Sequence, residues 1–191
     1  MKPLRDVIRA YAQENVVICT EGSSTEQPSV LLQSFLTCGN CCLMWVTVAV
    51  DEAERQIDII VTGSLKAPRV RIPQVSRFLE LANEDDSFGR FVFDVETGAV
   101  IYATSALVGE MDLDADAIGF GVRIAATRYD RLYPGLVQVI DADADPEKLW
   151  PLIERPDWGR INREYNSLKH RVPWDSPADI PALEGVLRLP V

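Results

Sequence analysis

The stretch from Ile72 to Ile140 constrains the fold most, because a helix pattern, a hairpin pattern and a second helix pattern follow one another in it without a gap. It opens on Ile72-Pro73, and proline suits the first turn of a helix because its missing N–H would be unpaired there anyway. Apolar residues then recur at intervals of three and four, which places Val75, Phe78, Leu79 and Ala82 on one helical face. Nothing in the polar run 83–87 requires burial, so we expect an exposed loop there.

A β-hairpin is predicted after this loop. Within residues 88–95, Phe91, Phe93 and Val95 alternate to one side, as in a half-buried strand. The tripeptide Glu96-Thr97-Gly98 has the composition of a tight turn, with a glycine available for a positive φ. Residues 99–104 return as the partner strand.

A long helix is predicted to complete the stretch. Asp112 or Asp114 can cap its start. Its apolar stripe has alternating spacings of four and three and consists of Ile118, Val122, Ala125, Tyr129, Leu132 and Leu136. We expect Pro134-Gly135 to kink or interrupt this helix near its end.

Several short motifs in this region occur in an order and spacing typical of a known family. They are Ile72-Pro73, Arg77-Phe78-Leu79, Leu81-Ala82-Asn83, Phe88-Gly89-Arg90-Phe91, Asp94-Val95-Glu96-Thr97-Gly98, Ile101-Tyr102 and Asp130-Arg131-Leu132-Tyr133-Pro134. Together they resemble the YbjN family of bacterial proteins, whose fold is similar to that of type III secretion chaperones. The resemblance covers roughly residues 57–140. It implies one antiparallel sheet with helices packed on it, often in a dimer, and a role in protein binding or regulation. The family has no established catalytic residues, so none is carried over.

Upstream of this region, one helix and several strands are predicted. Residues 3–14 form an amphipathic helix through Leu4, Val7, Ile8 and Tyr11, with no evident N-terminal cap. Strand patterns follow at 16–19, 29–37, 43–50 and 56–61, with a loop at 21–28 and a connector at 63–71. Gly39-Asn40 is a common two-residue hairpin turn, which would place Cys38 opposite Cys41.

The predicted fold class is therefore α+β, an antiparallel sheet flanked by helices in the order α-β-β-β-β-α-β-β-α. Residues 1–141 form the domain, and residues 142–191 form a C-terminal extension. That extension is rich in proline and tryptophan, which excludes one long helix, and we expect it to pack on the domain or on a second subunit. Asp145-Pro146 can start a short helix in it.

Charge and hydropathy limit the partners. The net charge of −10 argues against a nucleic-acid backbone or an anionic membrane as the main partner. The chain has no apolar run of membrane-spanning length and no signal-peptide core after its first residues, so we expect a cytoplasmic protein. A basic cluster, Arg155, Arg160, Arg163, Lys169 and Arg171, stands out from the acidic chain. It either pairs with acidic groups of the protein or its partner subunit, or forms an anion or acidic-peptide site.

Four cysteines and two aspartate ladders are the remaining candidates for chemistry. Cys19, Cys38, Cys41 and Cys42 could bind a metal or form a redox pair, but the Cys38-x-x-Cys41 motif falls at a hairpin and not at a helix N-terminus. Adjacent cysteines on a strand also point to opposite faces, so structural thiols are favoured. The ladders 112–116 and 141–145 lack the glycine and glutamate of a calcium loop and are better explained as helix caps.

The functional prediction is a non-enzymatic, dimeric, chaperone-like or regulatory module without a cofactor. It would bind another protein through an exposed sheet edge or an apolar groove beside the long helix. Trp45 and Tyr102 are the candidate contact residues in the strands, and Arg160 and Arg163 those in the extension. The alternative is a small metal-binding or thiol-redox protein that uses the cysteine cluster at 38, 41 and 42.

Overall fold

The computed structural model describes residues 2–15, 18–23, 28–36, 40, 43–84 and 86–153 of the chain, with the backbone alone for 18–23 and 28–36. The elements are α1 (Leu4–Glu14), β1 (Ile18–Ser23), β2 (Pro28–Leu36), β3 (Met44–Asp51), β4 (Gln56–Lys66), η1 (Arg69–Arg71), α2 (Ile72–Glu84), β5 (Arg90–Phe93), β6 (Ala99–Leu107), α3 (Ala115–Asp141), α4 (Pro146–Leu149) and η2 (Trp150–Leu152). The predicted order of helices and strands and the α+β class are confirmed.

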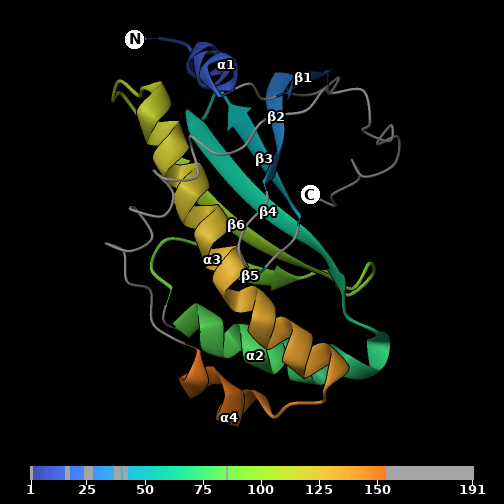
Figure 1. Cartoon of the computed structure of the whole chain (residues 1–191). Coiled ribbons are helices and arrows are strands. Elements are labelled where there is room, and N and C mark those ends of the chain that lie inside the picture. Colours follow the sequence, from blue (N-terminus) through green and yellow to red (C-terminus); the bar gives the residue numbers. More distant parts are fainter. Residues whose placement is uncertain are drawn as a thin grey trace. The chain divides into compact units, whose positions relative to one another are not determined.

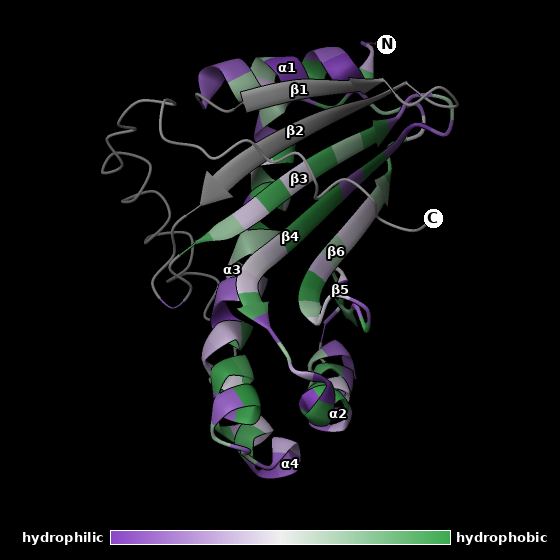
Figure 2. Ribbon diagram, turned by 90° about the vertical axis from the view of Figure 1, so that its right-hand side faces the viewer, coloured by the Kyte–Doolittle hydropathy of each residue, from purple (hydrophilic) through white to green (hydrophobic). Residues whose placement is uncertain are grey.

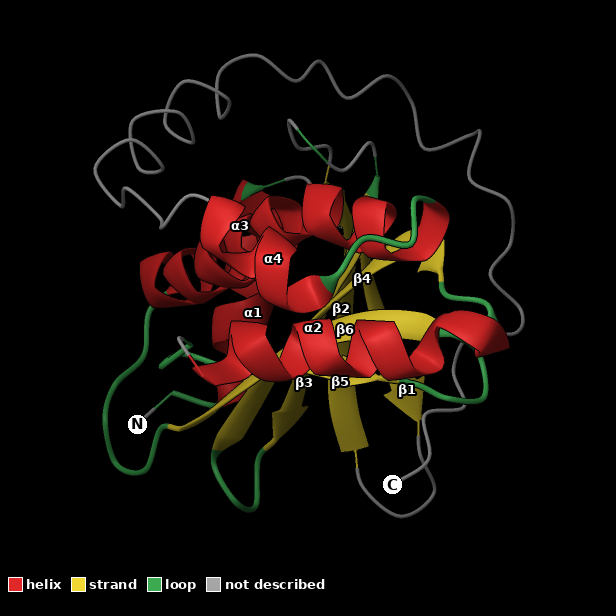
Figure 3. Cartoon of the chain, turned by 90° about the horizontal axis from the view of Figure 1, so that it is seen from below, coloured by secondary structure: helices red, strands yellow, loops and turns green. Residues whose placement is uncertain are grey.

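The described strands form one antiparallel sheet of six strands, in the order β1-β2-β3-β4-β6-β5. Helices α1, α2 and α3 pack on one side of it, with α3 running along the strands and α2 lying beside β5 (Figures 1 and 3). Figure 2 looks onto the opposite side, where the strands lie in front of α3. We call the helix-covered side the inner face and the other side the outer face.

The core lies between the inner face and the helices. Alternate residues of β3 and β4 are buried, as the period of two in a strand requires. The predicted stripes of α1, α2 and α3 are all buried in the same core. The largest fully buried side chains include Phe78, Tyr102 and Tyr129.

Two units divide the chain by compactness, Met1–Arg155 and Pro156–Val191, and all the described residues belong to the first. The domain boundary that the sequence predicts, after residue 141, therefore lies within the first of these units. Helix α4 belongs with the first unit because Leu149 is buried in its core and Trp150 packs edge-on against Phe78, with 6.0 Å between ring centroids.

Helix α3 continues through Pro134, so of the two expected effects, a kink or an interruption, the interruption is wrong. A proline inside a helix normally leaves the carbonyl four residues earlier without its N–H donor. Here that carbonyl belongs to Asp130 and accepts a hydrogen bond from Asn40 Nδ2 at 3.3 Å, while the Asp130 carboxylate accepts from the Asn40 amide at 3.0 Å. Asn40 thus supplies the donor that Pro134 lacks.

The predicted Gly39-Asn40 turn, with Cys38 opposite Cys41, lies outside the described residues except for Asn40, so it stays a prediction. The described part of the ladder ends with Leu36 paired to Met44. Strand β4 also differs from expectation, since it continues to Lys66 through part of the predicted connector.

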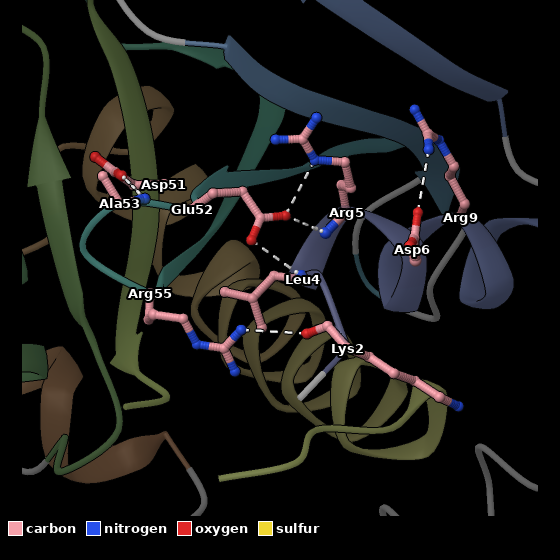
Figure 4. Close-up of polar contacts among 9 residues, drawn as sticks. All are labelled: Lys2, Leu4, Arg5, Asp6, Arg9, Asp51, Glu52, Ala53 and Arg55. Atoms are coloured by element: carbon pink, nitrogen blue, oxygen red, sulfur yellow. Dashed lines mark hydrogen bonds and ion pairs between the residues drawn. The ribbon is translucent and has the colours of Figure 1, made fainter. Parts of the chain in front are cut away.

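Helix α1 is capped from outside its own segment. Its N-cap residue, Pro3, has no capping side chain, but the Glu52 carboxylate accepts hydrogen bonds from the Leu4 amide at 3.1 Å and the Arg5 amide at 2.7 Å (Figure 4). The Arg5 guanidinium also donates to it at 3.3 Å. A carboxylate at a helix N-terminus is favoured both by these free amides and by the helix dipole.

This cap makes stability depend on pH. Burial by itself would raise the pKa of Glu52, but the hydrogen bonds from Arg5 and Leu4 outweigh it and hold that pKa below its ordinary value of 4.5. The stabilisation is therefore complete above pH 4.5 and is lost as the pH falls through the lower folded-state pKa.

Glu52→Gln is expected to lower the free energy of unfolding by about 1 kcal/mol at neutral pH. The neutral glutamine side chain accepts hydrogen bonds from the backbone N–H groups of the helix more weakly than a carboxylate does. Urea unfolding of both proteins across a pH series measures this. The difference between them should shrink as the pH falls below 4.5. Glu54→Gln, an exposed neighbour in the same hairpin, is the control and should change little. A difference that stays constant down to strong acid would contradict the role assigned to the Glu52 charge.

Candidate protein-binding surface

The outer face carries an apolar area, which is formed by side chains that the pairing of the strands places next to one another. Two neighbouring rows of side chains cross it, the first Trp45, Thr62, Ile101 and Val92, and the second Thr47, Ile60, Ala103 and Arg90. These residues alternate with the buried residues of β3, β4, β5 and β6, which fixes them on the side away from the helices. Val92 is 43% exposed and Ile60 and Ile101 are half-buried.

Charged groups on this face lie at the border of the apolar area. Asp58 occupies the next row toward the β3–β4 hairpin, and its carboxylate accepts from Gln56 Nε2 at 2.7 Å and from the Ser105 hydroxyl at 2.5 Å. Arg90 is exposed on β5, at the opposite side of the area. The described centre of the area therefore holds aliphatic and hydroxyl side chains without a charge.

The two strand residues expected to contact a partner lie on opposite faces. Trp45 is half-buried on the outer face, in the first apolar row. Tyr102 is fully buried on the inner face, so the prediction that it is an exposed contact residue is wrong. Both alternating sets of β6 are apolar, Val100 with Tyr102 and Ile101 with Ala103, so hydrophobicity along this strand does not decide which set faces the helices.

A buried polar cluster, which the sequence did not predict, surrounds the Tyr102 phenol. Asp86 was expected in an exposed loop, but its side chain is 2% exposed and its carboxylate lies 3.5 Å from Arg128 Nε of α3. The same carboxylate accepts hydrogen bonds from the Phe88 amide at 2.9 Å and the Gly89 amide at 3.3 Å. The signal available in the sequence was Asp86-Ser87-Phe88-Gly89, the pattern of an aspartate that bonds the amides two and three residues ahead.

Close packing holds this cluster together. The Arg128 guanidinium lies 5.9 Å from the centre of the Phe88 ring. A Cβ atom at Gly89 would stand 2.7 Å from the Tyr102 hydroxyl and 2.6 Å from the Ala103 carbonyl, so only glycine lets the loop approach the sheet this closely. The cluster joins the α2–β5 loop to β6 and α3.

We call this cluster the clamp, because its groups hold the α2–β5 loop in place and are not arranged for acid–base chemistry. Burial, reinforced by the negative charge of Asp86, raises the pKa of Tyr102, so the phenol stays protonated at neutral pH. The Asp86 carboxylate is engaged by two amides and a guanidinium. Neither group is thus set up as a general base.

The edge of the sheet at β5 is not open along its whole length, although an exposed edge was one predicted binding mode. The Asn83 side chain of α2 donates from Nδ2 to the Phe91 carbonyl at 2.9 Å and accepts from the Phe91 amide at 2.6 Å. Asn83 therefore uses both backbone groups at the middle of this edge strand.

The remaining predicted residues fall into two groups. The side chains of all four cysteines, and Arg160 and Arg163 entirely, lie outside the described residues. Among the aspartates of the two ladders, Asp114 caps α3 through the Ala117 amide at 2.9 Å and Asp145 caps α4 through the Glu147 amide at 3.1 Å, as predicted. Asp143 pairs with Arg71. Within the described ranges, no cluster of three or more potential metal ligands occurs and no helix has the length and apolarity to cross a membrane.

Comparison with known proteins gives a structural likeness. No protein-family model and no curated protein matches the sequence. Among the solved structures that match is the crystal structure of YbjN, a proposed transcription regulator from E. coli. Its sequence identity to this chain is 11% and the TM-score is 0.48, over 68% of this chain and 87% of the other. Membership of the YbjN family, which the sequence motifs suggest, stays a prediction.

Proposed function

We propose that this chain is a non-enzymatic protein-binding module, regulatory or chaperone-like, whose outer sheet face binds another polypeptide, a second copy of the chain included. The observation that carries the proposal is the pair of rows across β3, β4, β6 and β5, whose centre at Ile60 and Ile101 is uncharged and whose one charged member, Arg90, stands at the β5 end. The role in protein binding that the YbjN resemblance implies supports the same class of function.

Several properties of this face suit a polypeptide better than a small reactant. The two rows run across four adjacent strands, and aliphatic area with a polar border is the usual anatomy of a protein interface. Asp58, the carboxylate nearest the rows, is engaged by Gln56 and Ser105. The described residues of the face thus offer buriable area and no convergent acid–base pair.

The test is a charge placed in the middle of the area. Ile101→Lys should weaken binding to the partner by at least about tenfold, because a buried interface position would then hold an unpaired cation. Val70→Lys is the matched control, since Val70 is an aliphatic residue that is 75% exposed in η1, away from the sheet. The partner is identified by a photo-crosslinking residue at position 101, with the same residue at position 70 as reference, and its affinity is then measured with purified proteins.

Self-association is measured in parallel by sedimentation equilibrium, so that a second copy is recognised as the partner. Thermal unfolding of both variants shows that they remain folded. If the chain forms no crosslink from position 101 and stays monomeric, or if Ile101→Lys binds the partner as tightly as Val70→Lys does, the outer face is not the binding surface.

A further inference from the structure

The backbone groups along the outer edge of β5 have no role in the proposed function. β5 pairs with β6 on one side only and is the last strand of the sheet on that side. An edge strand offers unpaired N–H and C=O groups to the strand of another molecule, and natural sheets carry specific features that prevent such pairing.

The direction of the backbone groups follows from the ladder. Phe91 pairs with Tyr102, Val92 with Ile101 and Phe93 with Val100, and the Asp94 amide donates to the Ala99 carbonyl at 2.9 Å. Since hydrogen-bonded and non-hydrogen-bonded positions alternate in an antiparallel pair, Val92 and Asp94 direct their backbone groups to β6, and Phe91 and Phe93 direct theirs outward.

The Asn83 carboxamide meets the outward groups of Phe91 as a neighbouring strand would. One amide function accepts from the Phe91 N–H at 2.6 Å and donates to the Phe91 C=O at 2.9 Å. A carboxamide has the same donor and acceptor as a peptide unit, so it can replace the paired residue of an added strand. Asn83 is held in place because it belongs to α2, whose Phe78, Leu79 and Ala82 are buried in the core.

From this geometry we infer that Asn83 is an edge stop, which prevents β5 from pairing with β5 of a second copy. The second copy is the occupant that fits, because two identical antiparallel edge strands pair about a two-fold axis and each supplies the complement of the other. β5 has four residues, Arg90–Phe93, so its outward groups are those of Phe91 and Phe93, and occupying Phe91 removes half of them.

Asn83→Ala is the test variant, and Asn83→Asp is the second, because its carboxylate still accepts from the Phe91 amide but places an oxygen against the Phe91 carbonyl. Asn15→Ala is the matched control, since the Asn15 amide also donates to a backbone carbonyl, that of Tyr11 at 2.8 Å, far from any β5 contact. Sedimentation equilibrium compares the four proteins, and hydrogen exchange followed by NMR reports the Phe91 and Phe93 amides.

Asn83→Ala should self-associate about tenfold more tightly than the wild type, and Asn15→Ala should not. Asn83→Asp should not associate more tightly either, because its carboxylate still occupies the Phe91 amide and adds a charge at the edge. At low concentration the Phe91 amide of Asn83→Ala should exchange faster than in the wild type. At high concentration the Phe91 and Phe93 amides should become protected together. If folded Asn83→Ala sediments like the wild type, or associates without protecting these two amides, Asn83 is not an edge stop.

Discussion

Asp86→Ala is expected to lower the free energy of unfolding by about 3 kcal/mol, a large fraction of the stability of a domain of this size. The substitution leaves the Arg128 guanidinium, 13% exposed, without its carboxylate. It also removes the acceptor of the Phe88 and Gly89 amides, which shapes the loop before β5. Urea unfolding followed by circular dichroism gives the value directly.

Two further variants isolate the cause. Asp6→Ala removes the carboxylate of an exposed pair, Asp6 with Arg9, whose side chains are 53% and 41% exposed, and should cost less than about 0.5 kcal/mol. Asp86→Leu combined with Arg128→Met replaces the buried pair with apolar groups and should be more stable than Asp86→Ala alone. Equal losses for Asp86→Ala and Asp6→Ala would show that burial of the pair has no energetic consequence.

Gly63→Val is expected to lower the free energy of unfolding by about 3 kcal/mol, because it overfills the contact between β4 and α3. A Cβ atom at position 63 would stand 2.6 Å from the Tyr129 hydroxyl and 2.8 Å from its ring. Tyr129 is fully buried, so displacing its ring would disturb the core packed around it. Thermal and urea unfolding measure the loss.

Ser64→Val, in the same strand but exposed on the outer face, is the control and should change stability by no more than about 0.5 kcal/mol. Combining Gly63→Ala with Tyr129→Leu should give a favourable coupling energy in a double-mutant cycle, because the smaller side chain vacates the space that Cβ needs. If the two substitutions were simply additive, the close approach of Tyr129 would not be what requires glycine.

Local patterns were sufficient for the elements of this fold and insufficient for the contacts between them. The stripe of α3 and the caps Asp114 and Asp145 could be predicted, because each depends on residues only a few positions apart. The continuity of α3 through Pro134 could not, because the donor that replaces the missing N–H comes from Asn40, 90 residues away.

The polar run 83–87, which begins in the last turn of α2, is a second place where the sequence did not reveal the contacts. Asn83 and Asp86 were expected to be exposed on composition alone, yet one binds the edge of β5 and the other the buried guanidinium of Arg128. Several of the motifs that carry the YbjN resemblance, among them Phe88-Gly89 and Ile101-Tyr102, belong to this clamp or to the adjoining strand. On β6, the identity of the outer face could not be predicted because both sets of side chains are apolar.

The remote capping of α1 bears on how the chain acquires its structure during synthesis. Glu52, which binds the first amides of the helix, is translated 48 residues after Leu4. The surface under Tyr11 includes Gly119 of α3, which is translated later still. While the nascent chain grows, α1 can contact β1 and β2 but lacks α3, its main packing partner, and a helix of 11 residues is marginal on its own. This segment should therefore be among the last parts of the chain whose amides become protected from hydrogen exchange.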